Sequence, residues 1–258
     1  MDNQTLFEQD GPVAILTFNR PEARNAMTWG MYEALRETCE RVDEDPATRV
    51  LVLRGAGDRA FVSGTDIRQF LEFKTREDAL GYEARLDRSI GRLAEMKKPA
   101  IALVNGDAIG GGLFMALACD IRIAAEHARY GVPVARTLGN FPQPTNWTRL
   151  VAAIGMIRAR NLVLTARLMK ADEALATGLV DEVLPTEKLE ARVRELAHHI
   201  AGLAPLTLSA IKEATRRMMR IHTIPDAEEL VLSCYLSQDF QEGVRAFLDK
   251  RTPNWQGA

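Results

Sequence analysis

Three consecutive glycines at positions 110–112 lie between an apolar run at 100–104 and a second apolar stretch that ends near Asp120. The first run predicts a buried strand and the second a helix. Glycine allows a sharp turn and a close approach of a ligand, and the free N–H groups of a first helical turn attract negative charge. The segment could receive an oxyanion or a phosphate, or the glycines could serve only close helix packing. It lacks the spacing of a dinucleotide fingerprint and the ending of a P-loop.

The elements around this segment follow from hydrophobic periodicity and turn residues. We expect strands at 13–18, 50–53, 120–124, 129–131 and 179–184. We expect helices after an N-cap at Thr28, from 67 to 76, around 86–93, over 150–164, over a short stretch from 170 that Gly178 closes, and from 186 onwards with breaks near Pro205 and Pro225. Residues 132–146 read as an irregular loop. Two strands followed by a helix, repeated, predict an α/β fold of stacked β-β-α units rather than a doubly wound sheet.

Composition excludes several classes of function. The 258 residues are 47% hydrophobic and 26% charged, which fits one large globular domain or one domain with a small extension. A net charge of −2 does not indicate a basic surface for binding phosphates, so we expect no nucleic acid partner. No apolar run is long enough to cross a bilayer, so we expect no membrane role. The polar first ten residues lack a signal-peptide pattern and the three cysteines are scattered, which favours a cytoplasmic location.

Several segments, taken together, resemble the crotonase family, the enoyl-CoA hydratase/isomerase superfamily. Asn19-Arg20-Pro21 with residues 24–27 is similar to its N-terminal signature, and residues 61–67 are similar to its first oxyanion segment. The glycine segment is similar to its second oxyanion segment. Residues 164–167 with 171–180, and then 239–253, are similar to its later landmarks, so the resemblance spans nearly the whole chain in order.

The resemblance implies a crotonase-like superhelix of β-β-α turns over residues 1–200, with a helical region at 201–258 for oligomerisation and CoA contact. It implies homotrimers, or hexamers formed as dimers of trimers, and an acyl-CoA thioester as the ligand, with coenzyme A entering only as part of that substrate. The family polarises the thioester carbonyl with two backbone N–H groups, which correspond here to those of Thr65 and Gly111. Donors preset at an oxyanion are each worth about 10²–10³ in rate.

The resemblance also implies a set of substrate and CoA contacts. Arg24 would lie near the phosphates, and Phe247 and Lys250 would face the adenine, from this chain or from a neighbouring subunit. The thioester end would be lined by Ala26, Ser63, Asp66, Ile67 and Gly110. From the residues alone, the two cations read as solvated side chains, Phe247 as core, and Asp66 as an N-cap.

Two positions depart from the family. A hydratase of this family uses two glutamates to position water and move a proton, and these positions are occupied here by Phe114 and Val134. Neither side chain can take a proton from water, and a general acid–base group contributes about 10²–10⁴ in rate. We therefore expect an oxyanion pocket with little hydratase activity.

The loop at 135–143 also departs from the family, and it offers substitutes. Arg136 could bind a substrate carboxylate, or form a surface or interface salt bridge. Asn140 could orient a substrate carbonyl or water, or serve as a turn residue. Asp107 could act as a base if it points inward, although a solvated loop position is the better expectation from exposure rates. No metal-ligand spacing is present among the four histidines.

The sequence thus predicts an enzyme, a lyase or isomerase of acyl-CoA and fatty acid metabolism that acts through a thioester enolate. Isomerisation, decarboxylation or a specialised lyase step would fit the missing glutamates. The rival is a non-catalytic acyl-CoA-binding subunit that keeps the pocket without turnover.

Overall fold

The fold is built on a six-stranded sheet, seen in a computed structural model that describes residues 3–71, 73, 75–223 and 227–257. The strand order is β1-β2-β3-β5-β7-β10, and only β1 runs antiparallel to its neighbour. The strands are β1 (Thr5–Asp10), β2 (Val13–Phe18), β3 (Val50–Gly55), β5 (Ala100–Val104), β7 (Ile121–Ala125) and β10 (Glu182–Leu184). The strands predicted at 13–18, 50–53 and 100–104 are confirmed.

A second sheet of four short strands lies beside the first, in the order β4-β6-β8-β9. Its strands are β4 (Ala60–Val62), β6 (Asp107–Ile109), β8 (Arg129–Gly131) and β9 (Met169–Lys170). Three times the chain passes from a strand of the large sheet to a strand of the small one and then into helix, as in β5-β6-α4 with α4 at Gly111–Ala118. This confirms the predicted stacking of β-β-α units.

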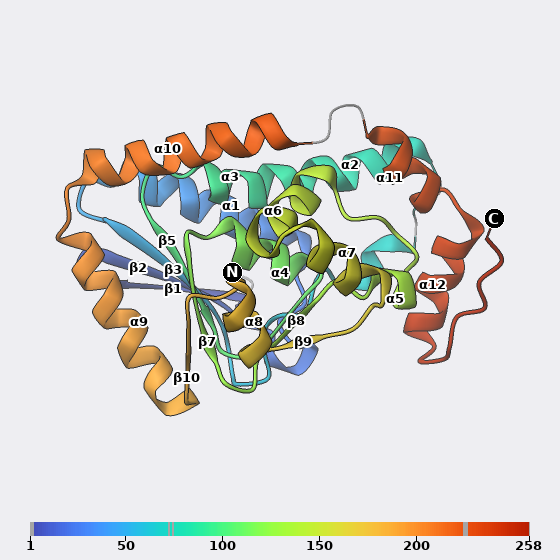
Figure 1. Cartoon of the computed structure of the whole chain (residues 1–258), viewed down its shortest axis with the longest axis horizontal. Coiled ribbons are helices and arrows are strands. Elements are labelled where there is room, and N and C mark those ends of the chain that lie inside the picture. The colour runs from blue at the N-terminus through green and yellow to red at the C-terminus, as the bar shows by residue number, and fades with distance from the viewer. Residues whose placement is uncertain (1–2, 72, 74, 224–226, 258) are drawn as a thin grey trace.

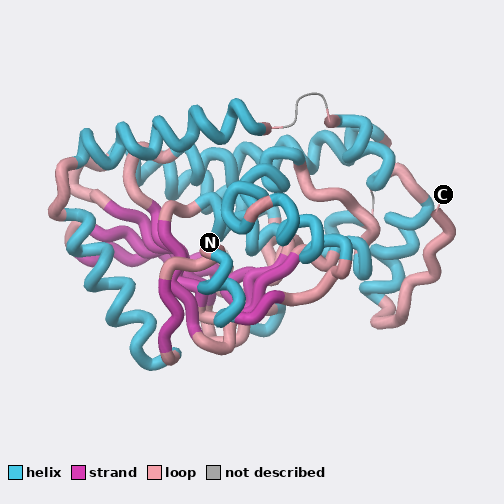
Figure 2. Tube along the Cα trace, viewed as in Figure 1, coloured by secondary structure: helices cyan, strands magenta, loops and turns pink. Residues whose placement is uncertain are grey.

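Helices cover both faces of the large sheet (Figures 1 and 2). Because successive strand residues point to opposite faces, the largely apolar strands β2, β3 and β5 supply residues to two cores. One core packs against α9 (Thr186–Ala201), and the other packs against α1 (Trp29–Glu44) and α4.

The remaining helices are α2 (Arg76–Leu86), α3 (Arg92–Glu95), α5 (Val134–Thr137), α6 (Pro144–Ile154), α7 (Met156–Leu164), α8 (Ala171–Thr177), α10 (Pro205–His222), α11 (Glu228–Tyr235) and α12 (Gln238–Leu248), with 3-10 turns η1 (Pro21–Ala23) and η2 (Ile67–Phe70) and a π-type turn η3 (Asp87–Gly91).

Several local predictions were wrong. The helix expected over 67–76 is only the turn η2, and α2 begins at Arg76 because Thr75 caps it. The loop expected over 132–146 contains α5, and α6 begins at Pro144, a residue suited to a first helical turn. The helix expected over 150–164 is broken at Gly155, whose φ is 80°. β1, β4, β6 and β9 were not predicted, and the break expected near Pro225 lies outside the described residues.

Other local predictions hold. The Thr28 side chain caps α1 by accepting from the N–H of Met31, and Gly178 ends α8 in a left-handed conformation with φ of 78°. Among the described residues, everything after 186 is helix or connection, and a helix break falls at Pro205. No helix in the described ranges has the length and apolar character needed to cross a membrane.

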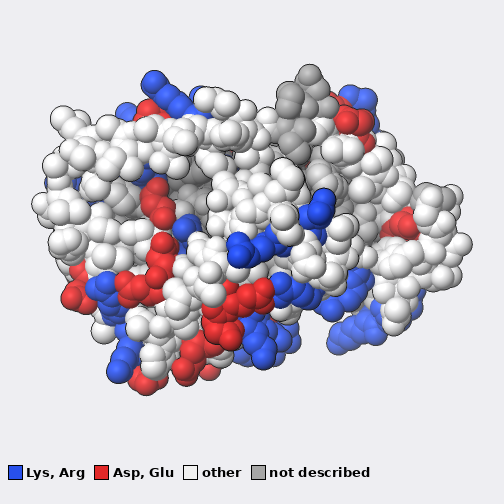
Figure 3. Space-filling view, viewed as in Figure 1, with Lys and Arg blue, Asp and Glu red and all other residues white. Residues whose placement is uncertain are grey.

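Charged side chains of both signs lie beside one another over the lower part of the face in Figure 3. Ion pairs such as Arg167–Glu173 and Arg192–Glu182 join them across the surface.

Candidate active site

The glycine segment forms a turn that enters the predicted helix α4, but the strand that leads into this turn is the unpredicted β6 and not the predicted strand at 100–104. Gly110 makes the turn with φ of 54° and ψ of −120°, a conformation that side chains with a Cβ rarely adopt. A Cβ at Gly112 would lie 1.9 Å from the carbonyl oxygen of Val62, so α4 is pressed directly onto β4. Gly111 begins the helix, where a main-chain N–H has no intrahelical partner. The alternative of close packing therefore describes Gly112, while the Gly111 N–H forms no main-chain hydrogen bond within the described residues.

The segment after β4 lies against the glycine turn. A Cβ built on Gly64 would lie 3.9 Å from the nitrogen of Gly111, and one built on Gly111 would lie 3.8 Å from Thr65 Oγ1. Thr65 pairs with Met27 in a parallel bridge, where Met27 N–H donates to Gly64 O and Asp66 N–H donates to Met27 O. In that pattern the N–H of Thr65 itself points away from Met27. The two N–H groups thus come from neighbouring segments.

A cavity of about 780 Å³ opens beside these segments, a size typical of small-molecule sites. All the residues predicted from the sequence as site residues line this cavity: Arg24, Ala26, Ser63, Thr65, Asp66, Ile67, Gly110, Gly111, Phe114, Val134, Asn140, Phe247 and Lys250. Phe114 is buried and Val134 is half-buried, so apolar side chains occupy the wall where the family places its two carboxylates.

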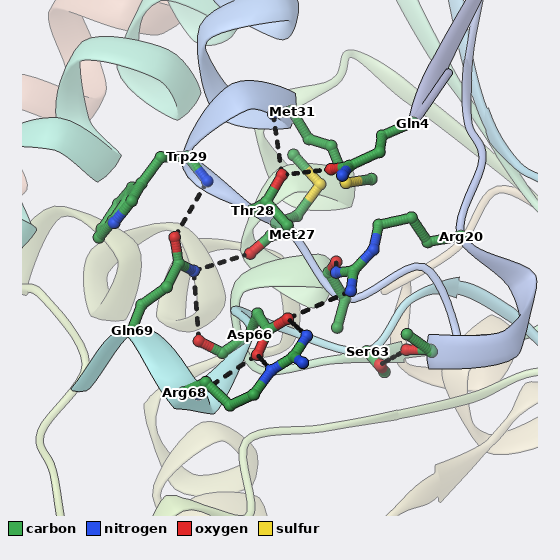
Figure 4. A network of polar contacts seen from close by, with 12 residues as sticks. Gln4, Arg20, Met27, Thr28, Trp29, Met31, Ser63, Asp66, Arg68 and Gln69 are labelled. Atoms are coloured by element: carbon green, nitrogen blue, oxygen red, sulfur yellow. Dashed lines mark hydrogen bonds and ion pairs between the residues drawn. The ribbon is translucent and has the colours of Figure 1, made fainter. Parts of the chain in front are cut away.

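Asp66 is held in a network of polar contacts between the segments at 20–31 and 63–69 (Figure 4). Its carboxylate accepts from the N–H and the guanidinium of Arg68, at 3.2 and 2.9 Å, and from the Arg20 guanidinium at 3.2 Å. The Arg68 side chain lowers the pKa of Asp66 despite partial burial. Asp66 is therefore an ionised cap of η2, as the sequence predicted, and all the contacts described for its carboxylate stabilise the charged form.

The cations near the predicted CoA phosphates are exposed. Arg24 and Lys250 both have a positive φ, of 51° and 56°, and neither forms an ion pair within the described part of the chain. Phe247 is 50% exposed, so its interpretation as a core residue was wrong. Phe247 lies in α12 and Lys250 directly after it, and both reach the cavity of their own chain. The structure therefore needs no neighbouring subunit to bring them there.

The expectation for Asp107 is corrected. Asp107 is buried rather than solvated, and Arg129 holds both of its carboxylate oxygens, at 2.9 and 2.6 Å. The Arg129 guanidinium occupies both oxygens of the carboxylate, so the Asp107 side chain is neither solvated nor free to meet a substrate. Arg136 is exposed on α5 at the edge of the cavity and forms no ion pair with any described residue.

A row of hydroxyls behind Thr65 was not predicted. Thr65 Oγ1 lies 2.9 Å from the Tyr32 hydroxyl and 3.0 Å from the Tyr82 hydroxyl. All three groups are buried, and burial raises the pKa of both tyrosines, so they remain neutral hydrogen-bonding groups. Because they bridge α1, α2 and the segment at 63–66, they fix the position of Thr65.

A buried carboxylic acid in the cavity wall was also missed. Glu83 of α2 is 7% exposed, and its Oε1 accepts from the Tyr235 hydroxyl at 2.7 Å. Asn140 Nδ2 donates to the same hydroxyl at 3.0 Å. Burial raises the pKa of Glu83 to about 7, and Asp87 one turn further on adds to the shift. One sequence signal could have found it, because residues 79, 83, 86 and 90 share one helical face and the other three are apolar.

Comparison with known proteins places the chain in a family. A sequence model described as Enoyl-CoA hydratase/isomerase matches residues 8–258. The short-chain-enoyl-CoA hydratase of Clostridium acetobutylicum is 34% identical over 96% of both chains. The crotonyl-CoA hydratase of Syntrophomonas wolfei is 36% identical over 97% of this chain and 96% of its own. The chain therefore belongs to the enoyl-CoA hydratase/isomerase (crotonase) family of acyl-CoA enzymes.

Solved structures that share the fold include both a decarboxylase and a hydratase. A methylmalonyl-CoA decarboxylase in complex with 2S-carboxypropyl CoA superposes with a TM-score of 0.90, at 30% identity, over 99% of this chain and 98% of that one. An enoyl-CoA hydratase/carnithine racemase from Magnetospirillum magneticum gives a TM-score of 0.80 at 32% identity, over 100% and 97% of the two chains. These relatives define an acyl-CoA enzyme with a crotonase-like fold, while the reaction differs among them.

Proposed function

We propose that the cavity binds an acyl-CoA thioester and holds its carbonyl oxygen with the N–H groups of Thr65 and Gly111. The contact between the segments at 64–65 and 110–111 carries this proposal, because it brings two main-chain donors from different elements to one wall. Charge that develops on the oxygen as an enolate forms is then stabilised by donors already in position.

The rest of the cavity supports this placement. Ala26, Ser63, Asp66, Ile67 and Gly110 would surround the thioester. Arg24 and Lys250 would meet the phosphates, since both are exposed cations at the cavity without an ion pair among the described residues. Phe247 would stack on the adenine with its exposed ring.

The reaction we propose starts from the enolate and not from addition of water. Phe114 and Val134 cannot activate water, so hydration would lack the groups that the family uses for it. Isomerisation of a 3-enoyl thioester and decarboxylation of a malonyl-type thioester both need the oxyanion hole, but they do not need those two glutamates. A buried acid in the wall favours isomerisation, because Glu83, when ionised, would repel a substrate carboxylate.

We further propose that the chain self-associates, as a trimer or a hexamer. None of the eighteen residues of α10 is buried, although the helix carries Leu206, Ile211, Met218 and Ile221 on its surface, with Leu206 84% exposed. α7 likewise exposes Met156, Ile157 and Leu164. Apolar surface of this kind marks an interaction site, and light scattering would give the mass of the assembly. The cysteines are free, which fits the proposed cytoplasmic location.

Crotonyl-CoA tests the function in two ways. The purified protein should bind crotonyl-CoA in a calorimetric titration and should hydrate it far more slowly than a known hydratase assayed beside it. Hydration at a comparable rate would overturn the interpretation of Phe114 and Val134. Tight binding without turnover of crotonyl, 3-enoyl or malonyl-type thioesters would favour the non-catalytic acyl-CoA-binding subunit.

A further inference from the structure

Glu83 is an ionisable side chain that the family's motifs leave unassigned. It lines the same cavity as Thr65 and Gly111 but comes from α2, a helix that contributes neither of the segments at 61–67 and 110–114. Burying a carboxyl group costs free energy unless both of its oxygens are hydrogen-bonded. Buried carboxyl groups with perturbed pKa values are common at functional sites. Its Oε2 finds no hydrogen-bond partner within the described residues, while its Oε1 is engaged by Tyr235.

The surroundings of Glu83 orient it without neutralising it. Tyr235 of α11 donates to Oε1, and Asn140 donates to the Tyr235 oxygen, so the hydroxyl hydrogen is directed at the carboxylate. Tyr82, the preceding residue, and Tyr32 of α1 are neutral, and Asp87 of η3 is an acid. No Lys or Arg of the described ranges forms an ion pair with Glu83, in contrast to Asp66 and Asp107. Glu83 is thus a buried acid in this cavity wall that no cation of the described residues engages, and burial raises its pKa to about 7.

We propose that Glu83 is the catalytic residue that transfers the proton in this site, and that Tyr235 and Asn140 are its positioning residues. This inference rests on the proposed function, since it requires a thioester whose oxygen is held by the Thr65 and Gly111 amides. In this proposal, a single carboxylate from a different helix takes the place of the two missing glutamates. One carboxylate suffices because the proton shift consumes no water.

The step balances for a 3-enoyl thioester. The Glu83 carboxylate takes a proton from C2, and the electron pair of that C–H bond enters a dienolate whose charge lies on the thioester oxygen. The neutral Glu83 then returns the proton to C4. The charge on oxygen collapses back to the carbonyl, the double bond ends between C2 and C3, and the carboxylate is regenerated. No oxidant, reductant or second substrate is needed.

Conversion of 3-butenoyl-CoA to crotonyl-CoA tests the role of Glu83. Glu83→Gln keeps the size of the side chain and an oxygen that can accept from Tyr235, but it cannot carry the proton. We expect its kcat to fall at least about 100-fold, with crotonyl-CoA affinity unchanged. Glu77→Gln is the matched control, because it makes the same charge change on the exposed first turn of α2 and should retain the parent rate.

The pH profile of Tyr235→Phe tests the positioning role. The Tyr235 hydrogen bond lowers the pKa of Glu83, so its loss should raise that pKa. Because the base must be ionised, kcat rises with pH through this pKa, and the midpoint of the rise should move up by about one pH unit. If Tyr235 had only a structural role, the loss of its hydroxyl would lower the rate at every pH without moving the midpoint.

The possible outcomes separate the two proposals. Equal kcat for the parent and Glu83→Gln would overturn the role of Glu83 and leave the oxyanion site intact. A parent that binds crotonyl-CoA but neither isomerises 3-butenoyl-CoA nor exchanges the C2 protons of butyryl-CoA in D₂O would also overturn it. A parent that binds no acyl-CoA would overturn the proposed function itself. If Glu83→Gln fails to fold, an unmoved midpoint in Tyr235→Phe decides against the proposal.

Discussion

The two ends of the cavity are built in different ways. The proposed thioester end consists of residues 61–67 and 110–114, two short segments whose main chains lie in contact. The proposed acyl end consists of Glu83, Asn140 and Tyr235, whose side chains meet although Glu83 and Tyr235 are 152 positions apart. A carbonyl can be polarised by backbone donors that any sequence supplies, provided the turn is right. A proton needs a particular side chain, and the fold can bring that side chain from any helix.

The largest effect should come from disturbing the backbone contact at the thioester end. Gly112→Ala would place a methyl group 1.9 Å from the carbonyl oxygen of Val62. Because α4 is pressed onto the main chain of β4 in the small sheet, we expect a loss of about 3 kcal/mol or more in the free energy of unfolding, measured in urea. An unchanged stability would show that α4 and β4 are not pressed together as described.

Restoring the family's carboxylates should change the reaction while leaving the thioester end in place. In the double variant Phe114→Glu with Val134→Glu, we expect crotonyl-CoA hydration at least about 100-fold faster than in the parent. The double glutamine variant at the same positions is the control, since it adds polarity without an acid. A folded glutamate variant with no gain would mean that the carbonyl is not held beside Phe114 and Val134.

The buried acid should make stability depend on pH. The folded chain keeps the proton of Glu83 up to a pKa of about 7, whereas the unfolded chain releases it near 4.5. Between these values the unfolded state binds fewer protons, so stability falls as pH rises, by about 3 kcal/mol in total. Glu83→Gln should therefore gain stability relative to the parent between pH 5 and pH 8 in urea titrations. If the variant and the parent differed in stability by the same amount at pH 5 and at pH 8, a protonated buried Glu83 would be contradicted.

The Thr65 side chain should matter for the fold more than for the ligand. Thr65→Val removes the hydroxyl that joins Tyr32 to Tyr82 and leaves the main-chain N–H in place. Stability should fall by about 2 kcal/mol, because two buried hydroxyls lose a partner, while crotonyl-CoA affinity is retained. A variant that stays stable but loses the ligand would assign the contact to the side chain.

The smallest effect should come from a glycine that faces open space. A Cβ at Gly81, in the interior of α2, would meet no atom within 4 Å. Gly81→Ala should therefore stabilise the chain by about 0.5–1 kcal/mol, in contrast to Gly112→Ala. A loss of stability would show that α2, which carries Glu83, is packed more tightly than described.

Each of the two segments of the proposed thioester end was predictable from sequence because the residues within it are contiguous. The predicted strand at 100–104 and the helix after the glycines both form, with the unpredicted strand β6 between them. The same holds for the cap made by Asp66, which depends on residues two positions away. The stacking of β-β-α units was also predictable, since the order of elements along the chain determines it.

The acyl end could not be predicted because tertiary contacts create it. Glu83 has no local feature beyond its place on an apolar helical face, and Tyr235 belongs to none of the motifs that revealed the family. Asp107 likewise appeared solvated from its neighbours in sequence, but Arg129 from the adjacent strand of the small sheet buries and pairs it. Such pairings depend on register between strands and helices, which a single sequence does not specify.

The position of α12 beside the cavity of its own chain has a consequence for ligand binding under dilution. Subunits held together only by contact separate by mass action as their concentration falls, but a chain cannot be diluted away from its own last helix. Because Phe247 and Lys250 remain beside the cavity in a lone chain, its affinity for a CoA thioester should be the same at nanomolar and micromolar protein. Assembly and ligand binding are then separate equilibria.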